Sequence, residues 1–327
     1  MAAILALLLL APAQDPLESA RALIEAGEHQ KAIEALLAIA APSPLRDYLR
    51  GVASFHLGRY PEASEALSGA VRDSLEGDPI RRQAPWMLGQ SLYVQGRFPD
   101  AAPWLEQALD LDPDNVEVAY MLGNSRLLSG DPGAAVQAFA RLFKVAPDSG
   151  AAYLLAGQMA VRHELNEKAR SLLRTALALD PKIPEAHYLL GIIAVFAGEI
   201  DEGVAQLKQE IAINPNFAMA YYRLGDAFTR LNQWDLAIPE LQRAVWLNPT
   251  HSGPFILLGK SYLQRGETRN AEAMLRRGLE MDPNNYLAHY LLGQTLMKAG
   301  RREAGKAELD RARELQKASE EPPPLLR

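Results

Sequence analysis

Apolar and small residues recur along this chain in blocks of 34 residues. Proline marks the end of each block, at five successive intervals of 34 residues: Pro113, Pro147, Pro181, Pro215, Pro249 and Pro283. A glycine lies in register with these prolines, preceded by leucine in six of seven blocks: Gly89, Gly123, Gly157, Gly191, Gly225, Gly259 and Gly293. No single globular domain has such a period, so the pattern predicts an array of repeated structural units.

Each block reads as two helices. A small residue follows the glycine by twelve positions, at Ala101, Ala135, Ala169, Gly203, Ala237 and Ala271. A large residue comes four positions later, at Leu105, Phe139, Leu173, Leu207, Leu241 and Leu275. This spacing places both on one face of a second helix. We expect turns near Gly96, Gly130, Gly198 and Gly266, and the proline prevents the helix from continuing. One hairpin cannot cover its own apolar face, so the hairpins must stack.

The spacing and residue types resemble the tetratricopeptide repeat. The third block carries Trp86-x-Leu88-Gly89, Gly96-Arg97-Phe98, Ala101, Leu105, Ala108 and Pro113. The resemblance covers nearly the whole chain. It implies an all-α fold, a right-handed superhelical solenoid of about nine helix-turn-helix repeats.

The array extends toward both ends of the sequence. Two further second helices are expected at 27–36 and 58–67, and Asp15-Pro16-Leu17-Glu18 is a typical helix start. The excess length at 73–82 predicts a longer loop after the second repeat, and the charged ninth repeat is typical of a solvated cap. The expected segments are a signal peptide 1–13, repeats 14–43, 44–81, 82–115, 116–149, 150–183, 184–217, 218–251, 252–285 and capping repeat 286–317, and a disordered proline-rich tail 318–327.

The first residues favour export. An apolar run from Ala2 to Ala11 ends in Ala11-Pro12-Ala13, which is typical of a secretory signal with cleavage after Ala13. The run is too short for a membrane span, which needs roughly 20 apolar residues, and no Lys or Arg precedes it. We expect a periplasmic protein with no stable span in the mature chain. Cytoplasmic location, or tethering by an uncleaved segment, stays open.

Composition and charge limit the classes of function that the chain can have. The formal net charge is −6 and the chain has no cysteine, which argues against nucleic acid as a partner and excludes disulfides and thiolate chemistry. The six histidines form no i, i+4 pair suited to a metal, and no phosphate-binding glycine loop or nucleophile elbow is present. We expect no catalytic residues, no cofactor and no metal. An enzyme is the least favoured hypothesis.

The family's geometry implies that first helices line a concave groove, with the positions three before and one after the repeat glycine facing it. The first position is mostly aromatic and the second is often a primary amide, with cations further along. The expected groove residues are Tyr48, Trp86, Gln90, Tyr120, Asn124, Gln158, Arg162, Tyr188, Tyr222, Arg230, Tyr290 and Gln294. Each ring could instead pack against the next repeat, and each amide could simply be solvated.

The leading hypothesis is a scaffold that binds a protein or peptide partner in this groove. Family members that capture a C-terminal carboxylate carry lysines where this chain has Tyr and Trp, so we do not expect that mode of binding. The alternative is an architectural subunit of a cell-envelope assembly that packs through its helix edges or convex face.

Overall fold

A computed structural model describes residues 15–320 of the chain, and all secondary structure in this range is α-helical. The helices have these bounds: α1 Pro16–Glu25, α2 His29–Leu37, α3 Pro44–His56, α4 Tyr60–Asp73, α5 Ile80–Val94, α6 Phe98–Leu111, α7 Val116–Leu128, α8 Pro132–Phe143, α9 Gly150–Arg162, α10 Asn166–Leu179, α11 Ala186–Phe196, α12 Ile200–Ile213, α13 Ala218–Arg230, α14 Trp234–Leu247, α15 Ser252–Gln264, α16 Thr268–Met281, α17 Tyr286–Lys298 and α18 Arg302–Glu320. Eighteen helices in this range correspond to nine hairpins, as predicted.

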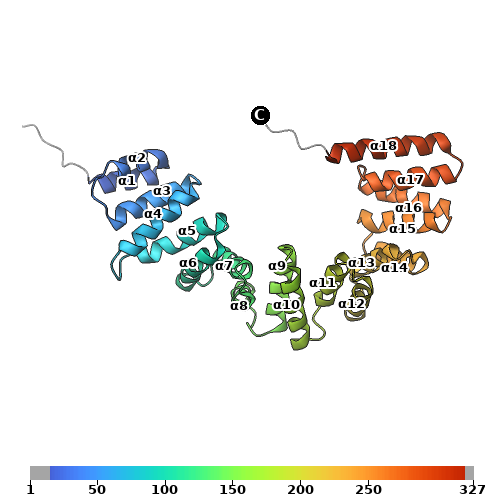
Figure 1. The fold of residues 1–327 in the computed structure, drawn as a ribbon, viewed down its shortest axis with the longest axis horizontal. Coiled ribbons are helices and arrows are strands. Elements are labelled where there is room, and N and C mark those ends of the chain that lie inside the picture. The colour runs from blue at the N-terminus through green and yellow to red at the C-terminus, as the bar shows by residue number, and fades with distance from the viewer. Residues whose placement is uncertain (1–14, 321–327) are drawn as a thin grey trace, which may run out of the picture. The chain divides into compact units, whose positions relative to one another are not determined.

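The chain divides into two compact units, Met1–Ala160 and Val161–Arg327, and the boundary falls within α9. In unit 1, α3 packs on α4, α5 on α6 and α7 on α8 (Figure 1). In unit 2, α11 packs on α12, α13 on α14, α15 on α16 and α17 on α18. Second helices also contact the first helix of the next hairpin: α2 with α3, α4 with α5 and α6 with α7 in unit 1, and α10 with α11, α12 with α13, α14 with α15 and α16 with α17 in unit 2. The predicted stacking of hairpins is therefore confirmed within both units.

The repeat glycine allows the two helices of a hairpin to pack closely. A Cβ atom on Gly89 of α5 would lie 2.8 Å from the Leu105 side chain of α6. A Cβ on Gly225 of α13 would lie 2.5 Å from Leu241 of α14. Real Cβ contacts are longer, so only glycine permits this packing.

The turns between first and second helices contain a residue in the left-handed region. Gly96 and Gly266 have φ of 73° and 81°, as predicted from the sequence. The fifth and seventh hairpins have Glu164 and Asn232 at this place, both with φ of 58°. The turn geometry is thus kept even where glycine is absent.

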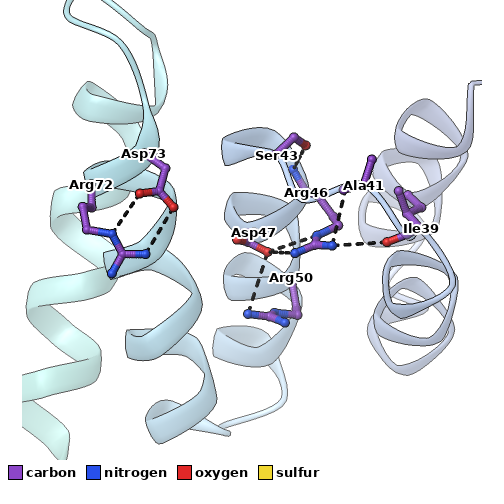
Figure 2. Close-up of polar contacts among 8 residues, drawn as sticks. All are labelled: Ile39, Ala41, Ser43, Arg46, Asp47, Arg50, Arg72 and Asp73. Carbon is purple, nitrogen blue, oxygen red and sulfur yellow. Dashed lines mark hydrogen bonds and ion pairs between the residues drawn. The ribbon is translucent and has the colours of Figure 1, made fainter.

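The connections that precede and follow the second hairpin each contain six residues. The predicted longer loop after the second hairpin is confirmed, because six residues (74–79) separate α4 from α5 while four (112–115) separate α6 from α7. The connection between α2 and α3 is held by Arg46, which donates to the Ile39 carbonyl at 3.2 Å and to Asp47 Oδ1 at 2.9 Å (Figure 2). Ser43 caps α3 by accepting the Arg46 backbone N–H at 3.2 Å.

The hairpin of α11 and α12 departs from the others. α11 begins two residues later than the 34-residue period requires, after Pro184 and after Glu185 with φ of 70°. The fully buried Glu210 of α12 accepts the Glu185 backbone N–H at 2.9 Å and the Tyr188 backbone N–H at 3.3 Å. Glu210 takes a place that is Ala or Gly in six other second helices: Ala70, Ala108, Ala176, Ala244, Gly278 and Ala312. Its carboxylate satisfies the N–H groups at this helix start.

The two predicted terminal segments lie mostly outside the described residues. The expected signal peptide, 1–13, lies entirely outside them, as does 321–327 of the expected tail. Residues 318–320 belong to α18, which has 19 residues and is longer than the other second helices. The last helix therefore extends past the expected end of the array at residue 317.

Candidate functional site

The first helix of each hairpin from the second to the ninth presents a repeated set of side chains on one side. These are the residues three before, one after and five after the repeat glycine, and their spacing of four residues aligns them along the helix. We call the surface that they form in each unit the first-helix face. In unit 1 it comprises Tyr48, Val52, His56, Trp86, Gln90, Val94, Tyr120, Asn124, Leu128, Leu154 and Gln158. In unit 2 it comprises Arg162, Tyr188, Ile192, Phe196, Tyr222, Asp226, Arg230, Ile256, Lys260, Gln264, Tyr290, Gln294 and Lys298.

The aromatic residues of this face are partly packed and partly open. Tyr120 and Tyr290 are 36% and 45% exposed, whereas Tyr48, Trp86, Tyr188 and Tyr222 are half-buried. Burial raises the pKa of the Tyr48 and Tyr222 hydroxyls, which keeps them protonated and able to donate a hydrogen bond.

Ring contacts explain the half-buried members. The Trp86 ring centroid lies 5.6 Å from that of Phe55 in the preceding hairpin. Tyr188 and Tyr222 meet the connection that follows their own hairpin, with Phe217 and His251 each 4.9 Å away between centroids. Packing against a neighbouring repeat and presentation at the surface therefore occur together in these residues.

The amide residues share one position of the repeat but differ in how deeply their side chains are buried. Asn124 is fully buried, and its side-chain amide donates to the Tyr93 hydroxyl at 3.3 Å. This placement corrects the prediction that Asn124 faces a ligand, because a short side chain at this position lies between neighbouring first helices. Gln90, Gln158 and Gln294 are half-buried, and Gln90 Oε1 has no hydrogen-bond partner within residues 15–320.

Cations gather on the first-helix face of unit 2. Arg162 and Arg230 are exposed, and Arg230 Nε lies 3.3 Å from Asp226 Oδ2. The Arg230 guanidinium carbon also lies 5.5 Å from the ring centroid of Phe196, which is 66% exposed.

The sequence analysis missed Arg223, which is adjacent to this face. Its guanidinium carbon lies 6.0 Å from the Phe196 centroid and 5.0 Å from that of Tyr222. The signal was present in the sequence, because equivalent positions of seven other first helices are apolar: Leu49, Met87, Met121, Leu155, Leu189, Leu257 and Leu291.

A cavity lies beside the last hairpin of unit 2. It has a volume of about 470 Å³ and is lined by α17 and α18. Its walls include Tyr290 and Gln294 of the first-helix face, together with Tyr286, Leu287 and Leu309. The predicted residues Tyr290 and Gln294 thus border a mainly apolar hollow.

The described residues show packing roles for the histidines that share one position of the repeat. His187 Nδ1 lies 2.6 Å from Gln206 Oε1, and His289 Nδ1 lies 2.6 Å from Glu308 Oε2. No group of three or more His, Asp or Glu residues within 15–320 could hold a metal ion. In the same range, no helix combines the length and the apolar character that crossing a bilayer requires.

Comparisons with known proteins agree with the fold. Two profiles described as Tetratricopeptide repeat match the sequence, one over residues 48–116, 160–195 and 188–252 and the other over residues 92–159 and 262–321. No curated protein sequence matches the chain.

Among solved structures, the chain is similar to MamA, residues 41 to the end, from Desulfovibrio magneticus RS-1. That match has a TM-score of 0.49 and 22% identity, and covers 53% of this chain and 98% of that one. The chain is also similar to YrrB, described as a TPR protein with an unusual peptide-binding site. This second match has a TM-score of 0.49 and 25% identity, and covers 56% of this chain and 94% of YrrB.

Proposed function

The chain belongs to the tetratricopeptide repeat family, and from this premise we propose that it is a protein-interaction scaffold. An extended segment or a helix of a partner protein binds to its first-helix faces. The observation that carries the proposal is the row of aromatic side chains on successive first helices, which includes the exposed rings of Tyr120 and Tyr290.

The properties of these side chains suit protein recognition. Tyrosine offers a large contact area with few rotatable bonds, so binding costs little side-chain entropy, and its hydroxyl can donate to a backbone carbonyl. Several such residues at regular intervals match a partner that runs across successive hairpins. Nothing in the arrangement of the described side chains suggests catalysis, and we propose that the protein acts by binding alone.

A second candidate function rests on a different surface. Trp246 on the second helix α14 is 69% exposed, and the Arg243 guanidinium lies 4.2 Å from the centroid of a Trp246 ring. Large exposed tryptophans are common at protein interfaces. An architectural subunit that packs through its second helices would use this residue and leave the first-helix faces empty.

Substitutions on the two surfaces separate these functions. Tyr120→Ala with Tyr290→Ala removes the two most exposed tyrosine rings of the first-helix faces, and Trp246→Ala is the matched control on α14. Proteins that copurify with the wild-type chain should be lost from the double tyrosine variant and kept by the control. Retention by the tyrosine variant together with loss from Trp246→Ala would favour the architectural function. Adding Tyr188→Ala and Tyr222→Ala extends the test to the half-buried rings, with circular dichroism as the check on folding.

We also propose that the protein is exported, on the strength of the apolar run that ends at Ala11-Pro12-Ala13. Amino-terminal sequencing of the mature chain should begin at Gln14. A cytoplasmic chain that retains Met1 would contradict export without affecting the proposed scaffold function.

A further inference from the structure

The first-helix faces of the two units differ in charge. In α3, α5, α7 and the part of α9 in unit 1 their three sets of positions hold no Lys, Arg, Asp or Glu, and the equivalent positions of α1 hold Arg21 and Glu25, whose charges cancel. In unit 2 the same positions hold Arg162, Arg230, Lys260, Lys298 and Asp226. With the adjacent Arg223, unit 2 has five cations and one carboxylate here, a net charge of 5 − 1 = +4, while the whole chain carries −6. This surface is therefore net positive, although the protein as a whole is net negative.

Two arginines surround one exposed ring. The guanidinium carbons of Arg223 and Arg230 lie 6.0 and 5.5 Å from the centroid of Phe196, whose side chain is 66% exposed. Aromatic rings attract guanidinium groups and orient them without neutralising their charge. The arrangement thus places two oriented positive charges beside an open apolar surface.

The charge in this cluster is only partly compensated within the protein. Arg230 pairs with Asp226 at 3.3 Å, but no ion pair joins Arg223 or Lys260 to a carboxylate within residues 15–320. Lys260 Nζ instead lies 5.9 Å from the Trp234 ring, and Arg223 Nε is buried with no hydrogen-bond partner in that range. Arg223 also lowers the pKa of the neighbouring His251, after the larger effect of burial. The Arg223 guanidinium thus keeps its positive charge without a carboxylate partner among the described residues.

We propose that the first-helix face of unit 2 binds an acidic protein segment, whose Asp or Glu side chains pair with Arg223 and Arg230 while an apolar side chain covers Phe196. The inference deepens the proposed scaffold function and rests on it. Carboxylates form paired hydrogen bonds with the planar guanidinium group, and these bonds are stronger than neutral ones. Asp226 lies beside Arg230 and would be displaced from it, or share it, when the ligand carboxylate arrives.

An acidic protein segment fits this surface better than a nucleic acid does. A phosphate backbone has a charge at every residue and needs a continuous basic stripe on its partner. Here the cations are interrupted by Asp226 and by apolar residues such as Ile192 and Ile256. A segment that mixes acidic and apolar residues matches this alternation.

Selection from a random twelve-residue peptide library tests the inference on the full chain. The peptides are displayed on phage as amino-terminal fusions, so no free C-terminal carboxylate takes part. Wild-type chain should select peptides with an excess of about two acidic residues over the starting library, one for each arginine. Arg223→Gln with Arg230→Gln should abolish this excess. Arg243→Gln on the second helix α14 is the control and should keep it.

A synthetic fluorescein-labelled copy of the best acidic peptide then gives the affinity. We expect its Kd to rise about tenfold or more in the double arginine variant, and to rise with salt in the wild type as screening weakens the ion pairs. The inference is overturned if the selected peptides carry no acidic excess, or if the double variant binds the acidic peptide as tightly as the wild type. Tighter binding of a labelled single-stranded uridine dodecamer would also overturn it, in favour of a nucleic acid.

The same experiment distinguishes this inference from the scaffold function. The wild-type chain could select neutral peptides that the double variant Tyr120→Ala with Tyr290→Ala does not bind. This result would leave the scaffold function intact and contradict only the acidic preference. If neither wild type nor any variant selects a peptide, both proposals fail.

Discussion

Gly89 of α5 faces Leu105 of α6, and a Cβ on Gly89 would lie 2.8 Å from the leucine side chain. The same contact recurs in hairpins of both units, between residues that are 16 positions apart in sequence. The other pairs are Gly51 with Leu67, Gly123 with Phe139, Gly191 with Leu207, Gly225 with Leu241, Gly259 with Leu275 and Gly293 with Leu309. A bare backbone against a large buried side chain is thus the constant feature of the hairpin.

Gly89→Ala should destabilise the protein by about 1–3 kcal/mol, because the added methyl overpacks a buried contact with little room to shift. Gly133→Ala is the matched control. A Cβ there would come no nearer than 3.8 Å to Asp131, and alanine favours the helix by up to about 1 kcal/mol. Urea unfolding followed by circular dichroism measures both. Equal midpoints for the two variants would contradict the role of the glycine.

Glu210→Ala should destabilise the start of α11 by about 2–3 kcal/mol, because the N–H groups of Glu185 and Tyr188 lose a buried charged acceptor. Hydrogen exchange at these amides should become faster. Glu202→Ala, at an exposed position of the same helix, should leave their protection unchanged. Unchanged protection in Glu210→Ala would show that the carboxylate does not cap α11.

Glu164→Gly should stabilise the protein by about 0.5–1 kcal/mol. Glu164 has φ of 58°, where a side chain is strained and glycine is not, although glycine loses more entropy on folding. Asn232→Gly, at the same φ, should increase the stability by a smaller amount, because asparagine adopts this conformation more readily than glutamate. Thermal unfolding compares the two variants. A loss of stability in Glu164→Gly would mean that the side chain contributes more than its strain costs.

His251 should make the stability of the protein depend on pH. Burial, and to a smaller extent Arg223, lower its pKa from the ordinary value of 6.5. The unfolded chain therefore binds more protons than the folded chain just below pH 6.5, so stability falls as the pH drops through this range. Arg223→Gln should raise the pKa of His251 in an NMR titration, and His251→Gln should reduce the loss of stability between about pH 6.5 and 5.5. A titration unaffected by Arg223→Gln would contradict this electrostatic coupling.

The sequence predicted the hairpins well because their signals are local and repeated. Gly96 and Gly266 have the expected turn geometry, and the repeat glycines contact the expected large residues. The late start of α11 was not predicted, since it depends on Glu210 reaching from another helix. A buried glutamate at a place that usually holds Ala or Gly was the only available sign.

The binding surface was harder to predict than the fold. Gln90 and Asn124 occupy the same position of the repeat, yet Asn124 is fully buried because its shorter side chain is covered and meets the Tyr93 hydroxyl. Arg223 was missed because its position is usually apolar, and its relation to Phe196 depends on two neighbouring hairpins. Exposure at one position is set by the sizes of neighbouring side chains, which a periodic pattern does not give.

Site-specific photocrosslinking in the native cell tests the central claim most directly. A photoreactive phenylalanine analogue is placed in separate chains at Tyr120 and Tyr290 on first helices, and at Trp246 on a second helix. We expect Tyr120 or Tyr290 to crosslink to a partner protein and Trp246 not to do so. Crosslinks from Trp246 alone, with none from either tyrosine position, would contradict it.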